Sequence, residues 1–297
     1  MVERRRLRAA VIGTGFVGPF HVDAIRRAGY ADVAWLVGSN PERTQVRAAA
    51  LRVPHATTDP EEVFRDPHVD VVHVCTPNDS HVDLAERALL EGKHVVVEKP
   101  LALNLTDAGR LQSLAAERGL HGAVAFTYRG YPMVREAQRM VGDGAIGSLR
   151  LLHGAYLQDW LSTEMDYNWR LEPAAGDSRA VADIGSHWFN TAEYISGDRI
   201  TGICADFATF IPVRQRPAEA SVAFAESTGG AGAGGDRLGG CRHHPGPVRL
   251  WCAGSHGAEP GQPGAPECLH PGAGRVARVA GVGAGGAGAA VDRDPGG

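Results

Sequence analysis

Lysine is almost absent from this chain, cysteines are few, and long apolar runs are missing. Of the 30 basic side chains in 297 residues only Lys93 and Lys99 are lysines, and the formal net charge is −4. A nucleic-acid-binding protein needs a basic patch, which this balance does not favour. The sequence has no run of about 18 apolar residues, the length needed to cross a bilayer. Its five cysteines form no C-x-x-C pair. We therefore expect a soluble, cytoplasmic protein with no disulfide framework and no nucleic-acid or membrane partner.

Apolar residues are also scarce towards the C-terminal end. Residues 229–297 hold 21 of the 39 glycines, only eight Leu and Val together, and no Ile, Phe, Tyr or Met. Such a segment has too little apolar surface to bury a core. It is either a natural disordered linker, a biased but folded end, or the product of a reading-frame shift in a GC-rich gene. The excess of arginine over lysine favours the frame shift. Its cysteines and histidines lack the paired spacing of a zinc site, so we expect no metal.

Up to about residue 126, short apolar runs alternate with helical patterns. The apolar runs predict strands at residues 7–12, 33–37, 69–75, 94–97 and 122–126, with helices between them. This alternation is typical of parallel strands joined by right-handed crossovers. The predicted fold class is therefore α/β, with a Rossmann-type, doubly wound parallel sheet.

A glycine-rich turn follows the first predicted strand and opens a helix. Gly13, Gly15 and Gly18 have the G-x-G-x-x-G spacing of a dinucleotide fingerprint in its proper context. Gly13 permits a tight turn, Gly15 lets the backbone approach a pyrophosphate, and Gly18 lets helix and strand pack closely. The phosphates would lie at the helix N-terminus. Together with Thr14 and Phe16, these glycines are the predicted phosphate-binding part of an NAD(P) site.

The second predicted strand lacks, at its end, the carboxylate that usually holds the ribose 2′-hydroxyl of NAD. Ser39 and Asn40 offer hydrogen-bonding groups there, and Arg43 is able to pair with a 2′-phosphate. The pattern therefore favours NADP slightly over NAD. The alternative is that Arg43 is a solvated residue at a helix start.

Polar residues also follow the third and fourth predicted strands. They are Thr76, Pro77, Asn78 and His81 after one strand, and Glu98 and Lys99 after the next. Open α/β sheets bind ligands at the carboxyl ends of their strands, so we place cofactor-binding residues here. A lysine in a desolvated pocket can release its proton, whereas an arginine cannot, which makes Lys99 a candidate catalytic residue. The alternative is a surface lysine at a strand end.

Four motifs taken together resemble one known family. They are Gly13-x-Gly15-x-x-Gly18-x-x-His21, Thr76-Pro77-Asn78-x-x-His81, Gly92-Lys93-His94-Val95 running into Glu98-Lys99-Pro100, and Asp183-Ile184-Gly185-Ser186-His187-Trp188. In this order, from about residue 7 to 217, they are similar to the Gfo/Idh/MocA family, named for glucose–fructose oxidoreductase, inositol dehydrogenase and a rhizopine-catabolism protein. The resemblance implies NAD(P)-dependent chemistry on a sugar or cyclitol carbinol, a cis Lys99-Pro100 peptide and a homo-oligomer.

The resemblance further implies a C-terminal α+β domain with an open sheet that carries the substrate face. Asp183 and His187 are spaced i, i+4, so on a helix both project from one face. Asp183 would orient a substrate hydroxyl, and His187 would act as acid or base near neutral pH. An N-capping Asp and a packed His are the alternative. Aromatic and polar candidates for a carbohydrate ring are Tyr128, Arg129, Asp159, Trp160, Trp169 and Arg170.

The second domain is predicted to be incomplete. Strands are expected at residues 149–158 and 200–211, but after about residue 226 nothing in the sequence matches the further strands of the family's sheet. The predicted organisation is a dinucleotide-binding domain at 1–124, a partial substrate domain at 125–226 and a disordered or frame-shifted tail at 227–297. The exposed sheet edge that results is expected to be prone to aggregation, and we do not expect the family's homo-oligomer in this shortened chain.

The leading hypothesis is an NAD(P)-dependent oxidoreductase of a sugar or polyol CH–OH group, in which Lys99 and His187 handle the hydroxyl proton. One alternative is a glycosidase of the same family that uses bound NAD transiently and releases sugar without accumulating NADH. Another is a cofactor-binding regulator or an inactive fragment, which the shortened second domain favours.

Overall fold

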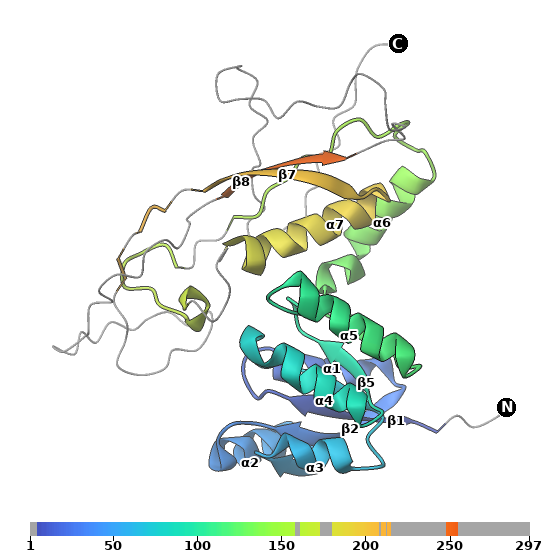
Figure 1. The fold of residues 1–297 in the computed structure, drawn as a ribbon, viewed down its shortest axis with the longest axis vertical. Helices are drawn as coiled ribbons and strands as arrows, with labels where there is room; N and C mark the ends of the chain where they lie inside the picture. The colour runs from blue at the N-terminus through green and yellow to red at the C-terminus, as the bar shows by residue number, and fades with distance from the viewer. Residues whose placement is uncertain are drawn as a thin grey trace. The chain divides into compact units, whose positions relative to one another are not determined.

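The computed structural model describes residues 5–157, 161–172, 180–207, 209–211, 213–214 and 248–254. The chain divides into two compact units (Figure 1). The first unit comprises Met1–Ala125, Asn168–Gly176 and Ala220–Glu226, and the second comprises Phe126–Tyr167, Asp177–Glu219 and Ser227–Gly297. Each unit has its own architecture.

A six-stranded parallel sheet forms the centre of the first unit, with the strand order β3-β2-β1-β4-β5-β6. The strands are β1 (Leu7–Ile12), β2 (Ala31–Val37), β3 (His55–Thr57), β4 (Val71–Val74), β5 (His94–Val97) and β6 (Gly122–Val124). The order reverses between β1 and β4, and ligands bind in doubly wound sheets beyond the strand ends at such a reversal. The predicted fold is confirmed. The three-residue β3 adds to the five predicted strands and is too short to give a periodic pattern.

Helices connect these strands, and the sequence explains where several of them begin and end. They are α1 (Gly18–Ala28), α2 (Pro41–Ala50), α3 (Pro60–Arg65), the 3₁₀ turn η1 (Asn78–Ser80), α4 (His81–Leu90) and α5 (Leu105–Glu117). The side chains of Asn40, Asp59 and Asn104 accept hydrogen bonds from the first turns of α2, α3 and α5. Gly29, with φ of 78°, ends α1 in the left-handed conformation.

The core of the first unit lies on both faces of the sheet. Ala9 and Val11 of β1 pack with α1 on one face, whereas Ala10 and Ile12 pack with α4 and α5 on the other. Helices on both faces are expected for a parallel sheet, whose strands are apolar throughout. Since both faces are covered, the edge formed by the strands' carboxyl ends is left for a site.

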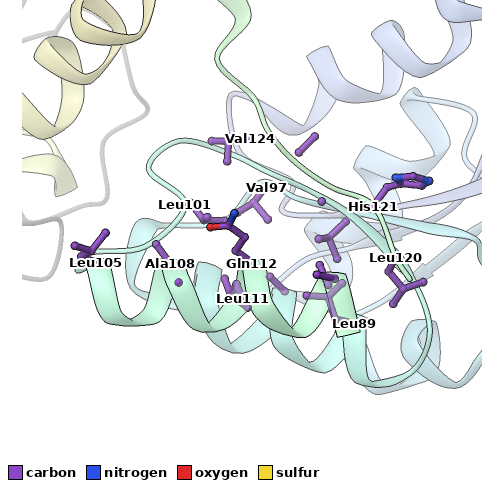
Figure 2. A pocket seen from close by; sticks show the side chains of 17 residues that line it. Leu89, Val97, Leu101, Leu105, Ala108, Leu111, Gln112, Leu120, His121 and Val124 are labelled. Atoms are coloured by element: carbon purple, nitrogen blue, oxygen red, sulfur yellow. The ribbon is translucent and has the colours of Figure 1, made fainter. Parts of the chain in front are cut away.

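An apolar groove of about 490 Å³ lies beside β5 and β6, between these strands and helices α4 and α5 (Figure 2). Alanine, leucine and valine dominate its lining, and Gln112 and His121 are its main polar members. Nucleotide phosphates need cations or clustered backbone N–H groups. The groove therefore does not match a dinucleotide, and the candidate site lies elsewhere.

The second unit contains helices and a two-stranded antiparallel sheet. Its elements are the 3₁₀ turn η2 (Thr127–Gly130), α6 (Pro132–Gly142), the π-helical turn η5 (Val181–Gly185), α7 (Ser186–Ser196), β7 (Ile200–Phe207) and β8 (Val248–Gly254). The turn η3 (Trp169–Leu171) belongs to the first unit. In the part of the chain that the structure describes, every helix is too short or too polar to cross a membrane.

The prediction that no strand follows residue 226 is wrong, because β8 pairs with β7 from Phe207↔Val248 to Ile200↔Gly254. The run Val-Arg-Leu-Trp-Cys was hidden by the glycine and proline that dominate the composition around it. Apart from β8, residues 227–297 lie outside the described residues, so the disordered or frame-shifted tail stays a prediction. The β7 strand also ends before the predicted residue 211.

The strand predicted at residues 149–158 is also wrong over its described part. Residues 149–157 hold only a single bridge, at Tyr156. At Gly154 a Cβ atom would lie 2.8 Å from the Trp188 indole nitrogen. The glycine that weakens the strand pattern is thus the residue that lets the indole approach the backbone.

Candidate active site

The glycine loop between β1 and α1 contains two crowded glycines and one open glycine. Gly13 has φ of +117°, and a Cβ there would lie 2.3 Å from the Cys75 carbonyl oxygen. A Cβ at Gly18 would lie 2.1 Å from the Gly13 carbonyl oxygen, whereas at Gly15 it would meet nothing within 4 Å. Gly13 and Gly18 are therefore required by packing, and the open space at Gly15 fits a pyrophosphate approaching the backbone.

The start of α1 adds an electrostatic reason for an anion to bind here. The N-cap residue Val17 gives no side-chain hydrogen bond to the first turn, which contains Pro19. The N–H groups and the dipole at a helix start favour a phosphate. Beside the loop, Thr14 packs against Gly38, and the exposed ring of Phe16 lies 5.2 Å from that of Phe20.

Ser39, Asn40 and Arg43 lie exposed beyond the end of β2. The Asn40 side-chain oxygen accepts a hydrogen bond from the Arg43 N–H at 2.9 Å and so caps α2. The cap uses the Asn40 oxygen and the Arg43 backbone, so it does not involve the Arg43 guanidinium. The segment Gly38-Ser39-Asn40-Pro41 contains no carboxylate.

A turn follows β4 and is tied together by hydrogen bonds. The Ser80 hydroxyl lies 2.7 Å from the Thr76 hydroxyl and 2.8 Å from the Pro77 carbonyl oxygen. Pro77 is exposed, and Asn78 is half-buried at the start of η1. Thr76, Pro77 and Asn78 therefore lie at the carboxyl edge of the sheet, next to the strand that carries the glycine loop.

His81 is buried inside the first unit and is not accessible to a cofactor. The residue is 0% exposed, its Nδ1 is 2.7 Å from the Pro100 carbonyl oxygen, and its Nε2 is 2.9 Å from the Thr76 carbonyl oxygen. A ring without exposed surface cannot touch a bound molecule. The prediction of His81 as a cofactor contact is corrected accordingly: it holds the loops after β4 and β5 together.

Glu98 points into the protein, and both of its oxygens have protein partners. Oε1 lies 2.9 Å from His21 Nε2, and Oε2 accepts a hydrogen bond from the Lys99 N–H at 3.2 Å. Burial raises the pKa of Glu98. The hydrogen bond and the charge of His21, together with the N–H and the charge of Lys99, lower it by more, so the net pKa is below the usual value. The carboxylate therefore stays ionised. The Lys99-Pro100 peptide is cis, as the resemblance implies, and Lys99 is half-buried.

His73, in β4, was not among the residues predicted from the sequence, and His21 had no predicted role. His73 Nδ1 lies 2.9 Å from His21 Nδ1. Burial and the neighbouring His21 lower the pKa of His73 to about 4, so it is neutral near pH 7. The signal was present, because His21 closes the glycine motif and His73 interrupts the apolar run Val71–Val74.

In the second unit, Asp183 lies in the π-helical turn and His187 in the first turn of α7. The helix predicted through both residues is thus widened over Asp183, a distortion that is frequent at functional sites. Sequence periodicity does not distinguish a single π turn from an α-helix. Asp183 is half-buried and His187 is buried.

Aromatic rings surround His187. Its ring stacks on Tyr128 with centroids 4.4 Å apart and meets Phe126 edge-on at 5.9 Å. The hydroxyls of Tyr128 and Tyr156 are 2.7 Å apart. Burial raises the pKa of the Tyr128 phenol, and Tyr156 and the charge of Asp183 raise it further. Tyr128 is therefore a neutral phenol throughout the physiological range, and Asp183, Tyr128 and His187 form one cluster.

Arg129 belongs to the same unit as this cluster. Its Nε donates to the Asn190 side-chain oxygen at 2.6 Å, and its guanidinium lies 5.2 Å from the centroid of the Tyr194 ring. Arg129 is thus fixed against α7, one turn beyond His187.

The other candidate substrate residues divide between the first unit and the residues outside the described ranges. Trp169 and Arg170 belong to the first unit, where the Arg170 guanidinium lies 4.6 Å over the Trp169 ring. The Asn168 side-chain oxygen accepts a hydrogen bond from the Arg170 N–H. Asp159 and Trp160 lie outside the described residues.

A doubly wound parallel sheet with an open glycine loop at its reversal point defines a dinucleotide-binding Rossmann protein. Residues 7–126 match the model of the GFO/IDH/MocA oxidoreductase family with an NAD-binding Rossmann fold, and residues 134–258 match that of the GFO/IDH/MocA C-terminal domain. The chain belongs to the Gfo/Idh/MocA family. The second match extends over β8, beyond the domain end predicted at residue 226.

Proteins similar in sequence to this chain include named dehydrogenases. Levoglucosan dehydrogenase of Pseudarthrobacter phenanthrenivorans is 29% identical over 77% of this chain and 60% of its own length. Myo-inositol 2-dehydrogenase of Thermotoga maritima is 27% identical over 69% of this chain and 59% of its own length. This chain thus spans about 60% of the length of these relatives.

Solved structures resemble the chain as well. An oxidoreductase domain protein from Kribbella flavida has a TM-score of 0.68 at 35% identity and covers 71% of this chain and 59% of its own. Levoglucosan dehydrogenase in complex with NADH and levoglucosan has a TM-score of 0.66 at 30% identity, with the same coverage.

Proposed function

We propose that this protein is an NAD(P)-dependent oxidoreductase of a sugar or cyclitol, with the bound nicotinamide exchanging a hydride with a substrate carbinol carbon. The observation that carries the proposal is the carboxyl edge of the first unit's sheet. There the open backbone at Gly15, the turn at Thr76 and the residue Lys99 follow the adjacent strands β1, β4 and β5. Relatives named for levoglucosan and myo-inositol support the substrate class.

The dinucleotide would be held at two places along this edge. Gly13, Gly15, Thr14 and Phe16, with the start of α1, hold the pyrophosphate, and the turn of Thr76, Pro77 and Asn78 borders it. Ser39, Asn40 and Arg43 hold the adenosine ribose, with Arg43 available to a 2′-phosphate. These roles follow from position at the strand ends and from exposure.

Three residues would act on the substrate hydroxyl. Lys99 and His187 exchange the hydroxyl proton, and Asp183 orients the hydroxyl. Lys99 follows the ionised Glu98 in the chain, and His187 is stacked on the neutral Tyr128. An amine and an imidazole are both able to exchange a proton with a hydroxyl. Tyr128, Arg129, Trp169 and Arg170 supply ring faces and hydrogen bonds to a sugar.

Substitution of Lys99 tests the proposal. Lys99→Ala and Lys99→Arg should each reduce turnover about 100-fold or more, because arginine keeps the charge but does not release its proton. NADH binding, measured by fluorescence titration, should remain. Levoglucosan and myo-inositol belong in the substrate panel, with NADH absorbance as the readout. Near-normal turnover in Lys99→Ala would overturn the assignment, and sugar release without NADH accumulation would favour the glycosidase.

The proposed slight preference for NADP rests on Arg43. Arg43→Ala should weaken NADPH binding roughly tenfold and leave NADH binding nearly unchanged, because only NADPH carries the 2′-phosphate. Titrations with both nucleotides give the ratio directly. An unchanged ratio would leave NAD as the better assignment.

A further inference from the structure

A chain of three titratable side chains runs from the middle of the sheet to the residue before Lys99. His73 of β4 lies 2.9 Å from His21 of α1, which lies 2.9 Å from the Glu98 carboxylate after β5. The side chains of His21 and Glu98 are only 11% and 14% exposed. The proposed function gives the two histidines of this cluster no role.

The direction of each hydrogen bond follows from the charges. Glu98 is ionised, so its carboxylate accepts and His21 Nε2 donates. The contact between the two Nδ1 atoms then holds one proton, supplied by His73 when His21 is neutral and by His21 when it is an imidazolium. His21 thus keeps both hydrogen bonds in either protonation state.

The same cluster fixes the backbone of the candidate catalytic residue. One Glu98 oxygen is held by His21, and the other accepts the Lys99 N–H. The titratable groups facing Glu98 in the described part of the chain are His21 from α1, Cys75 after β4 and Lys99 itself, and His73 faces His21. Glu98 is therefore a bridge between α1 and Lys99.

We propose that His21 is a positioning residue for Lys99, which it orients by holding the Glu98 carboxylate ionised and in place. The inference rests on the proposed function. If His21 loses its ring, Glu98 keeps the burial that raises its pKa but loses the donor that lowers it. Glu98 then protonates at higher pH, and Lys99 loses the negative charge beside it.

Two His21 variants separate positioning from simple packing. His21→Leu removes both hydrogen bonds, whereas in His21→Gln the amide N–H can donate to Glu98 and the amide oxygen can accept from His73. We expect kcat to fall about 10- to 100-fold in His21→Leu, with KM for the nucleotide changed less than about threefold. The acid limb of its pH–rate profile should move to higher pH, and His21→Gln should recover most of both. His68→Gln, at an exposed histidine, is the matched control.

A measurement on the ligand-free full-length protein keeps this test separate from the proposed function. The Glu98 carboxyl signal is followed by ¹³C NMR and is assigned by its loss in Glu98→Gln. It should titrate at higher pH in His21→Leu than in the wild type. If Lys99→Ala stays active, the proposed function fails while this titration still reports the pairing. If His21→Leu does not fold, His21→Gln should still show wild-type Glu98 titration and kcat. An unmoved Glu98 titration, or an equal loss of kcat in both His21 variants with an unmoved pH profile, would overturn the proposal.

Discussion

The two units hold their candidate functional residues by different means. In the first unit, backbone geometry and hydrogen bonds fix the site, as with the crowded Gly13 and the His81 ring between two carbonyl oxygens. In the second unit, ring packing contributes more, because His187 is stacked on Tyr128, while Arg129 is held by a hydrogen bond to Asn190. Hydrogen bonds to backbone fix a group's direction, whereas stacked rings tolerate sliding. The first unit is therefore expected to be the more sensitive to small substitutions.

The largest expected effect contrasts two glycines of the same loop. Gly13→Ala should lower the free energy of unfolding by about 3 kcal/mol or more, since the new Cβ meets a carbonyl and the φ value is positive. Gly15→Ala should change it by less than about 1 kcal/mol but weaken NAD(P)H binding, because the space it fills is the pyrophosphate's. Denaturant melts and nucleotide titrations provide the two readouts. Equal destabilisation by both would contradict the division of roles.

The second prediction concerns pH and the buried His73. Its folded pKa of about 4 lies below the unfolded value of 6.5, so between them the unfolded state binds more protons. Stability is therefore fully present above the unfolded value and is lost as pH falls, by about 2 kcal/mol between about pH 7 and about pH 5. His73→Gln should flatten this dependence in melts at both pH values. If the wild type and His73→Gln lose equal stability, His73 is not the group responsible.

The third prediction tests ring packing in the second unit. Tyr128→Phe should cost about 1 kcal/mol, because it loses only the hydrogen bond to Tyr156, whereas Tyr128→Ala should cost about 2 kcal/mol, because the stack on His187 is lost as well. Activity should follow the same order. If Phe were as damaging as Ala, a directional hydrogen bond would be holding His187, and the contrast between the units would disappear.

The smallest expected effect tests whether Asn40 binds the nucleotide as well as capping α2. Asn40→Ala and Asn104→Ala each remove a helix cap and should each cost about 1 kcal/mol in denaturant melts. Only Asn40→Ala should also weaken nucleotide binding, because Asn40 follows β2 beside the proposed ribose. Equal nucleotide affinity in both variants would show that Asn40 is a cap alone.

The first unit could be predicted well because its signals are local. Apolar runs separated by capped helices fix the strand and helix identities, and the family assignment from four motifs is confirmed. The inward orientation of His81 and Glu98 could not be read from spacing. It depends on partners that are distant in sequence, such as Pro100 for His81 and His21 for Glu98.

The second unit was predicted less well because its structure depends on contacts that have no sequence period. The π turn at Asp183 and the close approach of Trp188 to Gly154 arise from packing between separate segments. The β8 strand is seven residues within a glycine-rich stretch, so a composition averaged over 69 residues concealed it. Local β-forming residues decided the outcome there.

The first turn of α1 has a mechanical consequence. Gly18 packs against the Gly13 carbonyl of the glycine loop, and His21 hydrogen-bonds to Glu98. Both residues lie within one turn of α1. A helical turn moves as a rigid body. An anion bound at the glycine loop would therefore also restrict the motion of His21 and, through Glu98, of Lys99. Thermodynamic reciprocity then requires that ordering of the segment at Glu98 and Lys99 raise the affinity for that anion. One short helix thereby links affinity and alignment.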